Sequence, residues 1–298
     1  MTATDARTGS DAGDDRGAPG LRARLGAAAR FAMPGATGRA RHVTVRNMLA
    51  ARSNYGPLAT GLVEPFFYLL SIGVGVGALV GEVVDDGVSY DYTVFVAPAM
   101  LAAAAMNGAL SESTFNIFAK LRWDRLYDAL IATPLTPADV ALGELLFAQL
   151  RGTFYSAVFL LTMTALGLVP SWWAVLAVPA ATLIGVAFSA VGLSAVTWFR
   201  AWEDSEAVIG VQVVLFLFSA TFYPLSVYPE PLQWVARLSP LYHGAALCRD
   251  LILGRPGWSA VGHVAFLVVL AVVGLRVAAR RFTILLYDDG GGEAHSPR

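Results

Sequence analysis

The sequence predicts an all-α, polytopic membrane protein with six transmembrane helices and both termini in the cytoplasm. Three observations predict it. The 298 residues are 56% hydrophobic and only 14% charged, whereas soluble domains are about 25% charged, and their mean hydropathy is +0.58. Six apolar windows are long enough to cross a bilayer, which takes about 20 residues per helix. Basic residues are distributed unequally between the connections, and this distribution sets the orientation.

The six windows cover residues 58–80, 92–110, 140–168, 173–199, 207–227 and 258–279. Nine arginines precede the first window, whereas residues 81–91 carry four acidic and no basic side chains. Cytoplasmic loops near membrane helices are rich in Lys and Arg, so the first segment is expected inside and the second outside. The same rule places two further basic stretches inside: Lys120, Arg122 and Arg125, and Arg276, Arg280 and Arg281.

Polar segments flank this core. Residues 1–38 are rich in Ala, Gly, Asp and Arg and lack the apolar stretch of a signal peptide, so we expect a disordered cytoplasmic tail. Residues 283–298 form a second cytoplasmic tail. Residues 39–57 interleave arginines with apolar residues, which predicts an amphipathic helix at the cytoplasmic interface. This helix is either a docking or gating element or a simple anchor.

The connection 111–139 is more structured than a plain loop. Apolar residues recur at roughly helical spacing from Phe115 to Leu130, and Pro134 then breaks the run. Pro137 suits the first turn of a new helix, and Asp139 suits its positive end. A cytoplasmic helix with exposed aromatic side chains is a reasonable surface for binding a partner.

The segment 228–257 is apolar in patches and interrupted by prolines. This pattern favours short helices that dip into the membrane from outside, where protein must cover the irregular backbone. Its arginines, Arg237, Arg249 and Arg255, count against an external position, although less than the rest of the charge pattern counts for it.

Three strings together resemble the ABC-2 family of transporter permeases. They are GLVEPFFYLLSIGVGVG at 61–77, the connection 111–144, and FYPLSVYPEPLQWVARLSPLYHGAALCRDLILG at 222–254. The likeness is nearest to nodulation-factor and daunorubicin-type export permeases and covers residues 39–282. Its best signature is Pro240-Leu241 followed by Arg249 and Gly254.

This resemblance implies an ABC-2 (type V ABC exporter-like) fold in the cytoplasmic membrane, with re-entrant helices before the last span. It implies a second permease copy, in a homodimer or heterodimer, and two ATP-binding cassette subunits. Those subunits would couple through Phe115, Phe118, Leu121, Arg122 and Tyr127. The cargo would be a drug, as in antibiotic resistance, a natural product or a lipid-linked molecule.

The chain itself offers no site for covalent chemistry. Its single lysine, Lys120, stands in Phe-Ala-Lys-Leu rather than in a P-loop, so ATP and Mg would bind to the partner subunit. The four histidines are scattered and Cys248 is the only cysteine, which predicts no metal site. We therefore expect no enzyme, no cofactor and no nucleic-acid partner. His263 either contacts a proton or substrate, or forms a hydrogen bond with a neighbouring helix.

Placing a charged side chain inside a bilayer costs free energy, so such residues usually have a function. Glu64, Glu144 and Arg151 are therefore the candidate site residues. Glu144 and Arg151 are two helical turns apart and share a face, which allows an ion pair between spans. Alternatively the third span begins near Gly152, and these two charges stay hydrated. The sequence leaves open whether they serve transport or architecture.

The glycines Gly73, Gly77 and Gly81 repeat every four residues and predict close helix packing, either within the chain or across a dimer.

Two other functions remain open. A polysaccharide-export permease would be distinguished by a carbohydrate-binding ATPase encoded nearby. An ion-driven secondary transporter or a membrane-embedded enzyme would show several ionisable residues at the midplane or two similar halves, and it would work without an ATPase.

Overall fold

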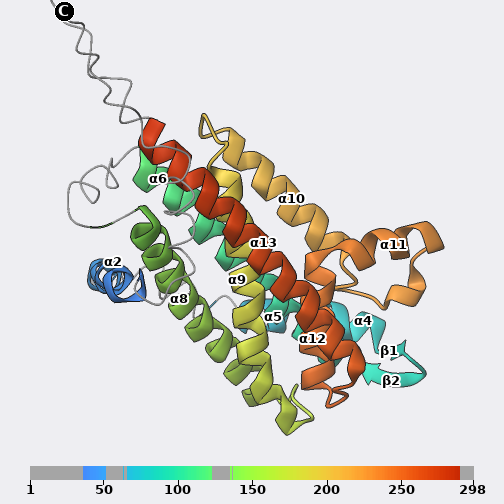
Figure 1. Ribbon diagram of the computed structural model, residues 1–298. Helices are drawn as coiled ribbons and strands as arrows, with labels where there is room; N and C mark the ends of the chain where they lie inside the picture. The colour runs from blue at the N-terminus through green and yellow to red at the C-terminus, as the bar shows by residue number, and fades with distance from the viewer. Residues whose placement is uncertain (1–35, 52–62, 64–65, 123–134, 136, 289–298) are drawn as a thin grey trace, which may run out of the picture.

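The structure is a computed structural model that describes residues 36–51, 63, 66–122, 135 and 137–288, and these are mostly helical (Figure 1). Four described helices are long and apolar enough to cross a membrane: Tyr92–Lys120, Asp139–Ala165, Trp172–Val196 and Trp258–Arg281. They correspond to the second, third, fourth and sixth predicted windows. The helix Trp172–Val196, which corresponds to the fourth window, forms the centre of the bundle and contacts the other three helices.

The second predicted helix continues well beyond residue 110. It comprises α5 (Tyr92–Ser111), a π-helical turn η2 (Glu112–Asn116) and α6 (Ile117–Arg122). Asp91 caps its start by accepting a hydrogen bond from the Thr93 amide at 2.8 Å. The predicted connection 111–139 therefore begins as the end of this helix rather than as a loop.

The third helix, α8, begins at Pro137, as the sequence predicts, and runs unbroken to Ala165 (Pro137–Ala165). The chain shows no interruption near Gly152, the alternative start of the span. The fourth helix follows as a 3-10 turn, η3 (Trp172–Leu176), and α9 (Ala177–Val196), and the last helix is α13 (Trp258–Asp288).

Two predicted spans are not established by the described residues. The first window is described at residue 63 and from Phe66, where helical residues lead into the π-helix η1 (Ser71–Gly77) and α4 (Ala78–Val80). The fifth corresponds to α10 (Asp204–Phe218), whose 15 residues span only about 22 Å of a hydrocarbon core about 30 Å thick. Four of the six predicted spans therefore correspond to helices long and apolar enough to cross a membrane, and the other two stay predictions.

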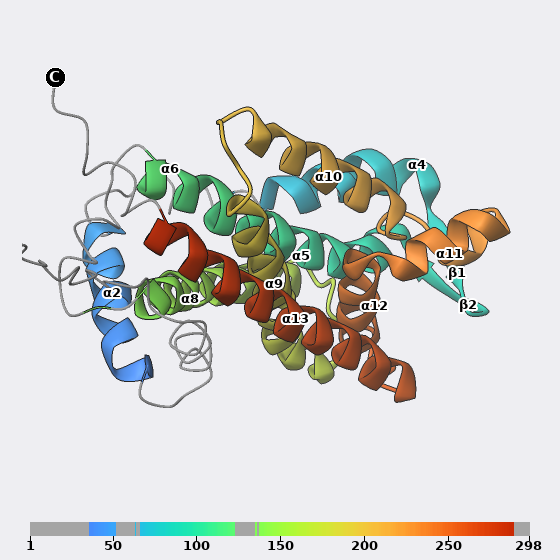
Figure 2. The same ribbon diagram turned by 45° about the horizontal axis from the view of Figure 1, so that its top comes forward.

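The acidic stretch between the first two windows is a β-hairpin rather than a plain loop. Strand β1 (Glu82–Asp85) pairs antiparallel with β2 (Val88–Asp91). Asp86 and Gly87 both have positive φ, at 50° and 79°, as a type I′ turn requires. The hairpin lies at the opposite end of the bundle from α2 (Ala36–Ala51) (Figure 2).

The segment 228–257 contains two short helices, α11 (Glu230–Leu238) and α12 (Pro240–Ile252), after the short turn η4 (Leu225–Val227). Proline in the first turn starts both helices. Helix α12 is inserted among α5, α9 and α13, and its side chains Leu241, Cys248 and Ile252 are fully buried. The prediction of short helices is confirmed, while their depth in a membrane stays a prediction.

Small residues set the closest helix contacts. A Cβ added at Gly77 would lie 2.7 Å from the hydroxyl of Thr93 on α5, and Gly73 also faces Thr93. The spacing predicts close packing, and these two glycines pack within the chain. Gly81 serves differently, because it ends α4 with φ of 71°.

Candidate functional site

Two ion pairs join the helix α5–η2–α6 to α8. Arg151 pairs with Glu112, and the Lys120 ammonium lies 2.6 Å from Glu144 Oε2. The two members on each helix are about two helical turns apart, and the helices run in opposite directions, so the charges meet as two successive rungs. We call these four residues the ion-pair ladder.

Glu144 is the most connected member of the ladder. Its side chain is 5% exposed, and its Oε2 accepts hydrogen bonds from Lys120 Nζ at 2.6 Å and from Asn47 Nδ2 at 2.9 Å. One carboxylate thereby joins three elements: α2, α6 and α8. Its other oxygen, Oε1, is buried without a hydrogen-bond partner among the described residues.

Glu112 occupies the first position of the π-helical turn, a local distortion often found at functional sites. Besides its pair with Arg151, it accepts a hydrogen bond from Asn116 Nδ2 at 2.7 Å. The Arg151 guanidinium also lies 5.8 Å from the centre of the Tyr155 ring. Each charge of this rung is therefore partnered, as buried charges must be.

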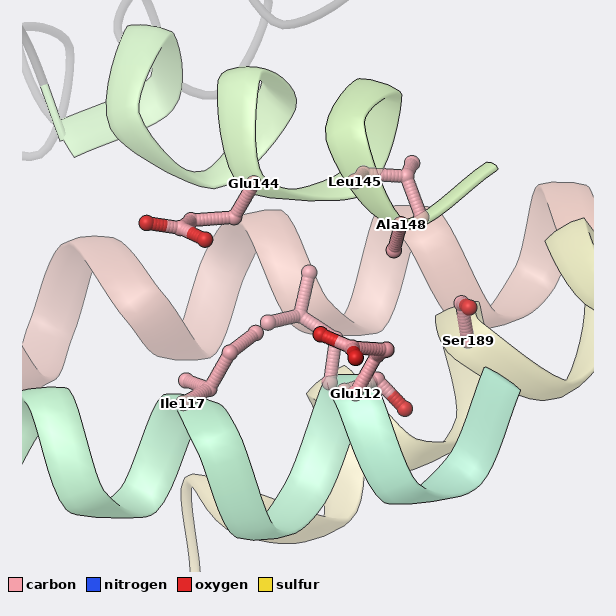
Figure 3. A pocket seen from close by; sticks show the side chains of 8 residues that line it. Glu112, Ile117, Glu144, Leu145, Ala148 and Ser189 are labelled. Atoms are coloured by element: carbon pink, nitrogen blue, oxygen red, sulfur yellow. The ribbon is translucent and has the colours of Figure 1, made fainter. Parts of the chain in front are cut away.

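A cavity of about 10 Å³ lies between the two rungs, which is room for about one water molecule. Its lining includes the carboxylates of Glu112 and Glu144 and the hydroxyl-bearing Ser189, which come from three different helices (Figure 3). The polar lining gives a water hydrogen-bond partners there, beside the buried carboxylate of Glu144.

The structure changes the interpretation of the predicted charged residues. Glu144 and Arg151 share a face of α8, and each forms an ion pair with the preceding helix, the arrangement between helices that the sequence allows. The sequence interpretation missed Glu112 as a site residue, and it considered Lys120 as a cytoplasmic topology signal and a rejected nucleotide-binding lysine but not as an ion-pair partner. The signal was the spacing of charges: Glu112 and Lys120 are eight residues apart before the connection, and Glu144 and Arg151 are seven residues apart after it. Glu64 lies outside the described residues.

The described coupling residues lie in the last turns of the helix α5–η2–α6, at the Lys120 end of the ion-pair ladder. Phe115 and Phe118 pack against Trp202, with ring centroids 5.7 and 6.0 Å apart, and Phe118 also contacts Phe199 at 6.4 Å. Phe118 is only 3% exposed, so the expectation of an exposed aromatic surface is wrong for this residue. Leu121 and Arg122 end α6, and Tyr127 lies outside the described residues.

The predicted signature residues between positions 240 and 254 hold α12 in place. Pro240 and Leu241 start the helix. Arg249 is 6% exposed and donates from Nε to the Phe95 carbonyl at 3.2 Å and from Nη2 to the Ala220 carbonyl at 3.0 Å. Its guanidinium lies 3.9 Å from the centre of the Phe95 ring, a favourable cation–π geometry. Gly254, with φ of 75°, ends the following turn against Ser171.

A larger cavity, of about 210 Å³, lies between the helical residues after Phe66, α5 and α10. Its lining is mostly apolar, with a few polar groups, and comprises Tyr68, Met100, Ala103, Ala104, Asn107, Ile209, Gln212, Val213 and Phe216. Within the described part of the chain, Gln212 Nε2 is buried without a hydrogen-bond partner. An apolar cavity with few polar groups is the usual form of a small-molecule site.

His263 forms a hydrogen bond with a neighbouring helix, the second of its two predicted roles. Its Nδ1 lies 2.8 Å from Nδ1 of His243 on α12, and His243 Nε2 lies 2.9 Å from the Arg237 carbonyl. Since a carbonyl only accepts, a neutral His243 donates from Nε2 and accepts from His263. No group of three or more potential metal ligands occurs among the described residues.

Comparison with known proteins gives matches over most of the chain. The family described as ABC-2 type transporter matches residues 40–253. Nodulation protein J of Rhizobium leguminosarum bv. trifolii is 32% identical over 232 residues, which cover 76% of this chain and 86% of the relative. Nodulation protein J of Bradyrhizobium diazoefficiens is 32% identical over 233 residues, with the same coverage. The matched range includes the ion-pair ladder and Arg249.

Proposed function

Because this chain belongs to the ABC-2 type transporter family, a family of multi-pass membrane proteins, we propose that it is the membrane-spanning subunit of an ATP-driven exporter in the cytoplasmic membrane. Its energy would come from a separate ATP-binding subunit, present in two copies, which would bind ATP and Mg. The chain itself would supply a path and no covalent chemistry. Its relatives are named nodulation proteins, which leaves the cargo of this chain to be identified.

The ion-pair ladder is the observation that carries the proposal. The predicted coupling residues sit where α6 ends, and the ladder links this end of the helix to the start of α8 through Lys120 and Glu144. Two cross-linked antiparallel helices move as a unit, since interrupting either rung leaves a buried charge without a partner. A force applied near residues 115–127 would thus reach the membrane-crossing parts of both helices together.

The cavity beside α10 supports a path for amphipathic cargo. Its lining is largely apolar, while Asn107 and Gln212 supply amide groups that can donate and accept hydrogen bonds. None of its described lining residues is Asp, Glu, Lys or Arg, so a cargo with polar but uncharged groups fits it best. The exposed side chains of α10, among them Val211, Val214 and Leu217, would face lipid or a second permease copy.

The test begins by asking whether an ATP-binding subunit is encoded alongside this chain, as the proposal requires. We expect the two to copurify and, in vesicles, to move a fluorescent amphipathic probe only with ATP and Mg. Replacing residues 123–130 with a Gly-Ser linker of equal length should abolish ATP-dependent transport while leaving membrane insertion intact. Normal transport by the linker variant, or transport by the chain without any ATPase, would overturn the proposal.

A further inference from the structure

The helix α2 lies across the end of the bundle, next to the start of α8, rather than along the other helices (Figure 2). Its inner face packs on α8 through the buried side chains Ala40 and Val43. Gly143 permits this contact, because an added Cβ there would lie 2.5 Å from Val43 Cβ. Thr44 Oγ1 also donates to the Gly143 carbonyl at 3.0 Å. One face of α2 is therefore fully occupied by the protein.

The opposite face of α2 is apolar at one end and cationic at the other. Val45, Met48 and Leu49 are 53%, 44% and 58% exposed. Arg41 and His42, also exposed, precede Val45 by about one helical turn and lie on the same face. A crosswise helix with an apolar ridge and flanking cations has the chemistry of a helix that lies in a lipid interface.

We propose that this outer face of α2 binds anionic phospholipid headgroups at the cytoplasmic surface, with Arg41 on the phosphates and Val45, Met48 and Leu49 in the acyl boundary. Basic side chains next to a membrane are attracted by anionic lipids, and an apolar ridge alone would not distinguish these from neutral lipids. The inference rests on the proposed cytoplasmic position of this end of the bundle.

Lipid binding at α2 would bear on the ion-pair ladder. Asn47, on the inner face of the same helix, donates to Glu144 Oε2 at 2.9 Å. The lipid surface and α8 would thus hold α2 from opposite sides. Anionic lipid would then favour the arrangement in which Asn47 and Lys120 share the Glu144 carboxylate.

The experiment measures lipid contact directly, without ATP or a partner subunit. The full chain carrying Val45→Cys is labelled with bimane and placed in phosphatidylcholine vesicles containing brominated phosphatidylglycerol or brominated phosphatidylcholine. Cys248 is 0% exposed, so labelling is directed to position 45. We expect the phosphatidylglycerol form to be preferred roughly threefold or more at position 45, with the preference falling at high salt.

Two controls make the result specific. Leu161→Cys places the same label on an exposed position of α8 within a membrane-crossing stretch, where we expect no preference. Arg41→Gln should reduce the preference at position 45 to near one, whereas Arg237→Gln, on α11, should leave it unchanged. Equal quenching by both lipids at position 45, no quenching there by either, or a preference that survives Arg41→Gln would each overturn the inference. None of these outcomes bears on ATP-driven transport.

Discussion

Lys120 Nζ lies 2.6 Å from Glu144 Oε2 although the two residues belong to different helices, one ending and the other beginning on either side of the connection 123–136. The pair closes the base of this connection. Because Glu144 also accepts a hydrogen bond from Asn47, a change in this one carboxylate affects α2, α6 and α8 together.

The first prediction concerns this pair. Glu144→Gln should lower the free energy of unfolding by about 1–3 kcal/mol, because it leaves the Lys120 ammonium without its counter-charge in a partly buried position. It should also reduce ATP-dependent transport by the complex. Thermal unfolding of the purified chain in detergent and the probe-transport assay measure the two effects.

The charge-swapped double variant Lys120→Glu/Glu144→Lys is the control. It should recover most of the stability, since the pair is re-formed and the Asn47 amide can turn to present its oxygen. If the double variant is as unstable as the sum of the two single variants, the pair does not act as a unit.

The second prediction concerns the contact between α2 and α8. Gly143→Ala should push α2 away from α8, because the new Cβ would lie 2.5 Å from Val43 Cβ and 2.7 Å from the Ala40 carbonyl. Such overpacking costs about 1–3 kcal/mol. We expect a lower unfolding temperature and increased proteolysis within α2.

Gly152→Ala is the matched control on the same helix. Nothing lies within 4 Å of a Cβ at this position, and alanine favours a helix over glycine by about 1 kcal/mol. This variant should therefore be neutral or slightly more stable. Equal loss of stability in both variants would contradict the prediction, because alanine improves helix propensity at both positions and only the Cβ at position 143 meets α2.

Much of this architecture follows from local sequence signals. Apolar windows locate the four long helices, and Pro137 with Asp139 marks the start of α8. The hairpin also had a signal, because Asp86-Gly87 is a strong type I′ pair, but its acidic charge favoured a loop interpretation. Local signals of this kind act within a few residues, so a single sequence can reveal them.

The remaining features depend on contacts between distant residues. Glu112, Ser113 and Thr114 are polar enough to suggest the end of a helix, yet the helix continues. Arg151 pairs with Glu112, and the hydroxyls of Ser113 and Thr114 donate back to the Ala109 and Leu110 carbonyls. The hydropathy of a residue does not indicate which distant residue pairs with it, so these contacts could not be predicted from the sequence.

The third prediction concerns the buried guanidinium of Arg249. Arg249→Met should lower the free energy of unfolding by about 2–5 kcal/mol, because the Phe95 and Ala220 carbonyls lose their charged donor in a buried position. Arg249→Lys should recover only part of this loss, since an ammonium lacks the planar fork that reaches both carbonyls and stacks on the Phe95 ring.

Arg237→Gln provides the comparison, because Arg237 is exposed on α11 and contacts the Trp234 ring. This variant should change stability by less than about 0.5 kcal/mol. The measurement compares unfolding curves of the unchanged protein and of the Arg249→Met, Arg249→Lys and Arg237→Gln variants in the same detergent. Full stability of Arg249→Lys would show that charge alone, and not the two directed hydrogen bonds, holds α12 in place.

The fourth prediction concerns the amide groups of the cavity beside α10. Gln212 Nε2 is buried without a hydrogen-bond partner in the described residues, an arrangement that weakens the protein unless a ligand or water binds there. Gln212→Leu should therefore keep or raise the unfolding temperature and, at the same time, lower ATP-dependent transport of a probe that carries an amide or hydroxyl group. The expected decrease is roughly tenfold, the effect of losing one buried hydrogen bond to the cargo.

Val213→Leu, one residue further along α10 and in the same lining, changes volume without removing a polar group. It should affect probes with and without hydrogen-bonding groups alike, whereas Gln212→Leu should discriminate between them. For each variant, the ratio of the transport rates of the two probes, with and without hydrogen-bonding groups, thus separates recognition of polar groups from a change in cavity volume. A variant Gln212→Leu that transports both probes at the normal rate would place the path of the cargo elsewhere in the molecule.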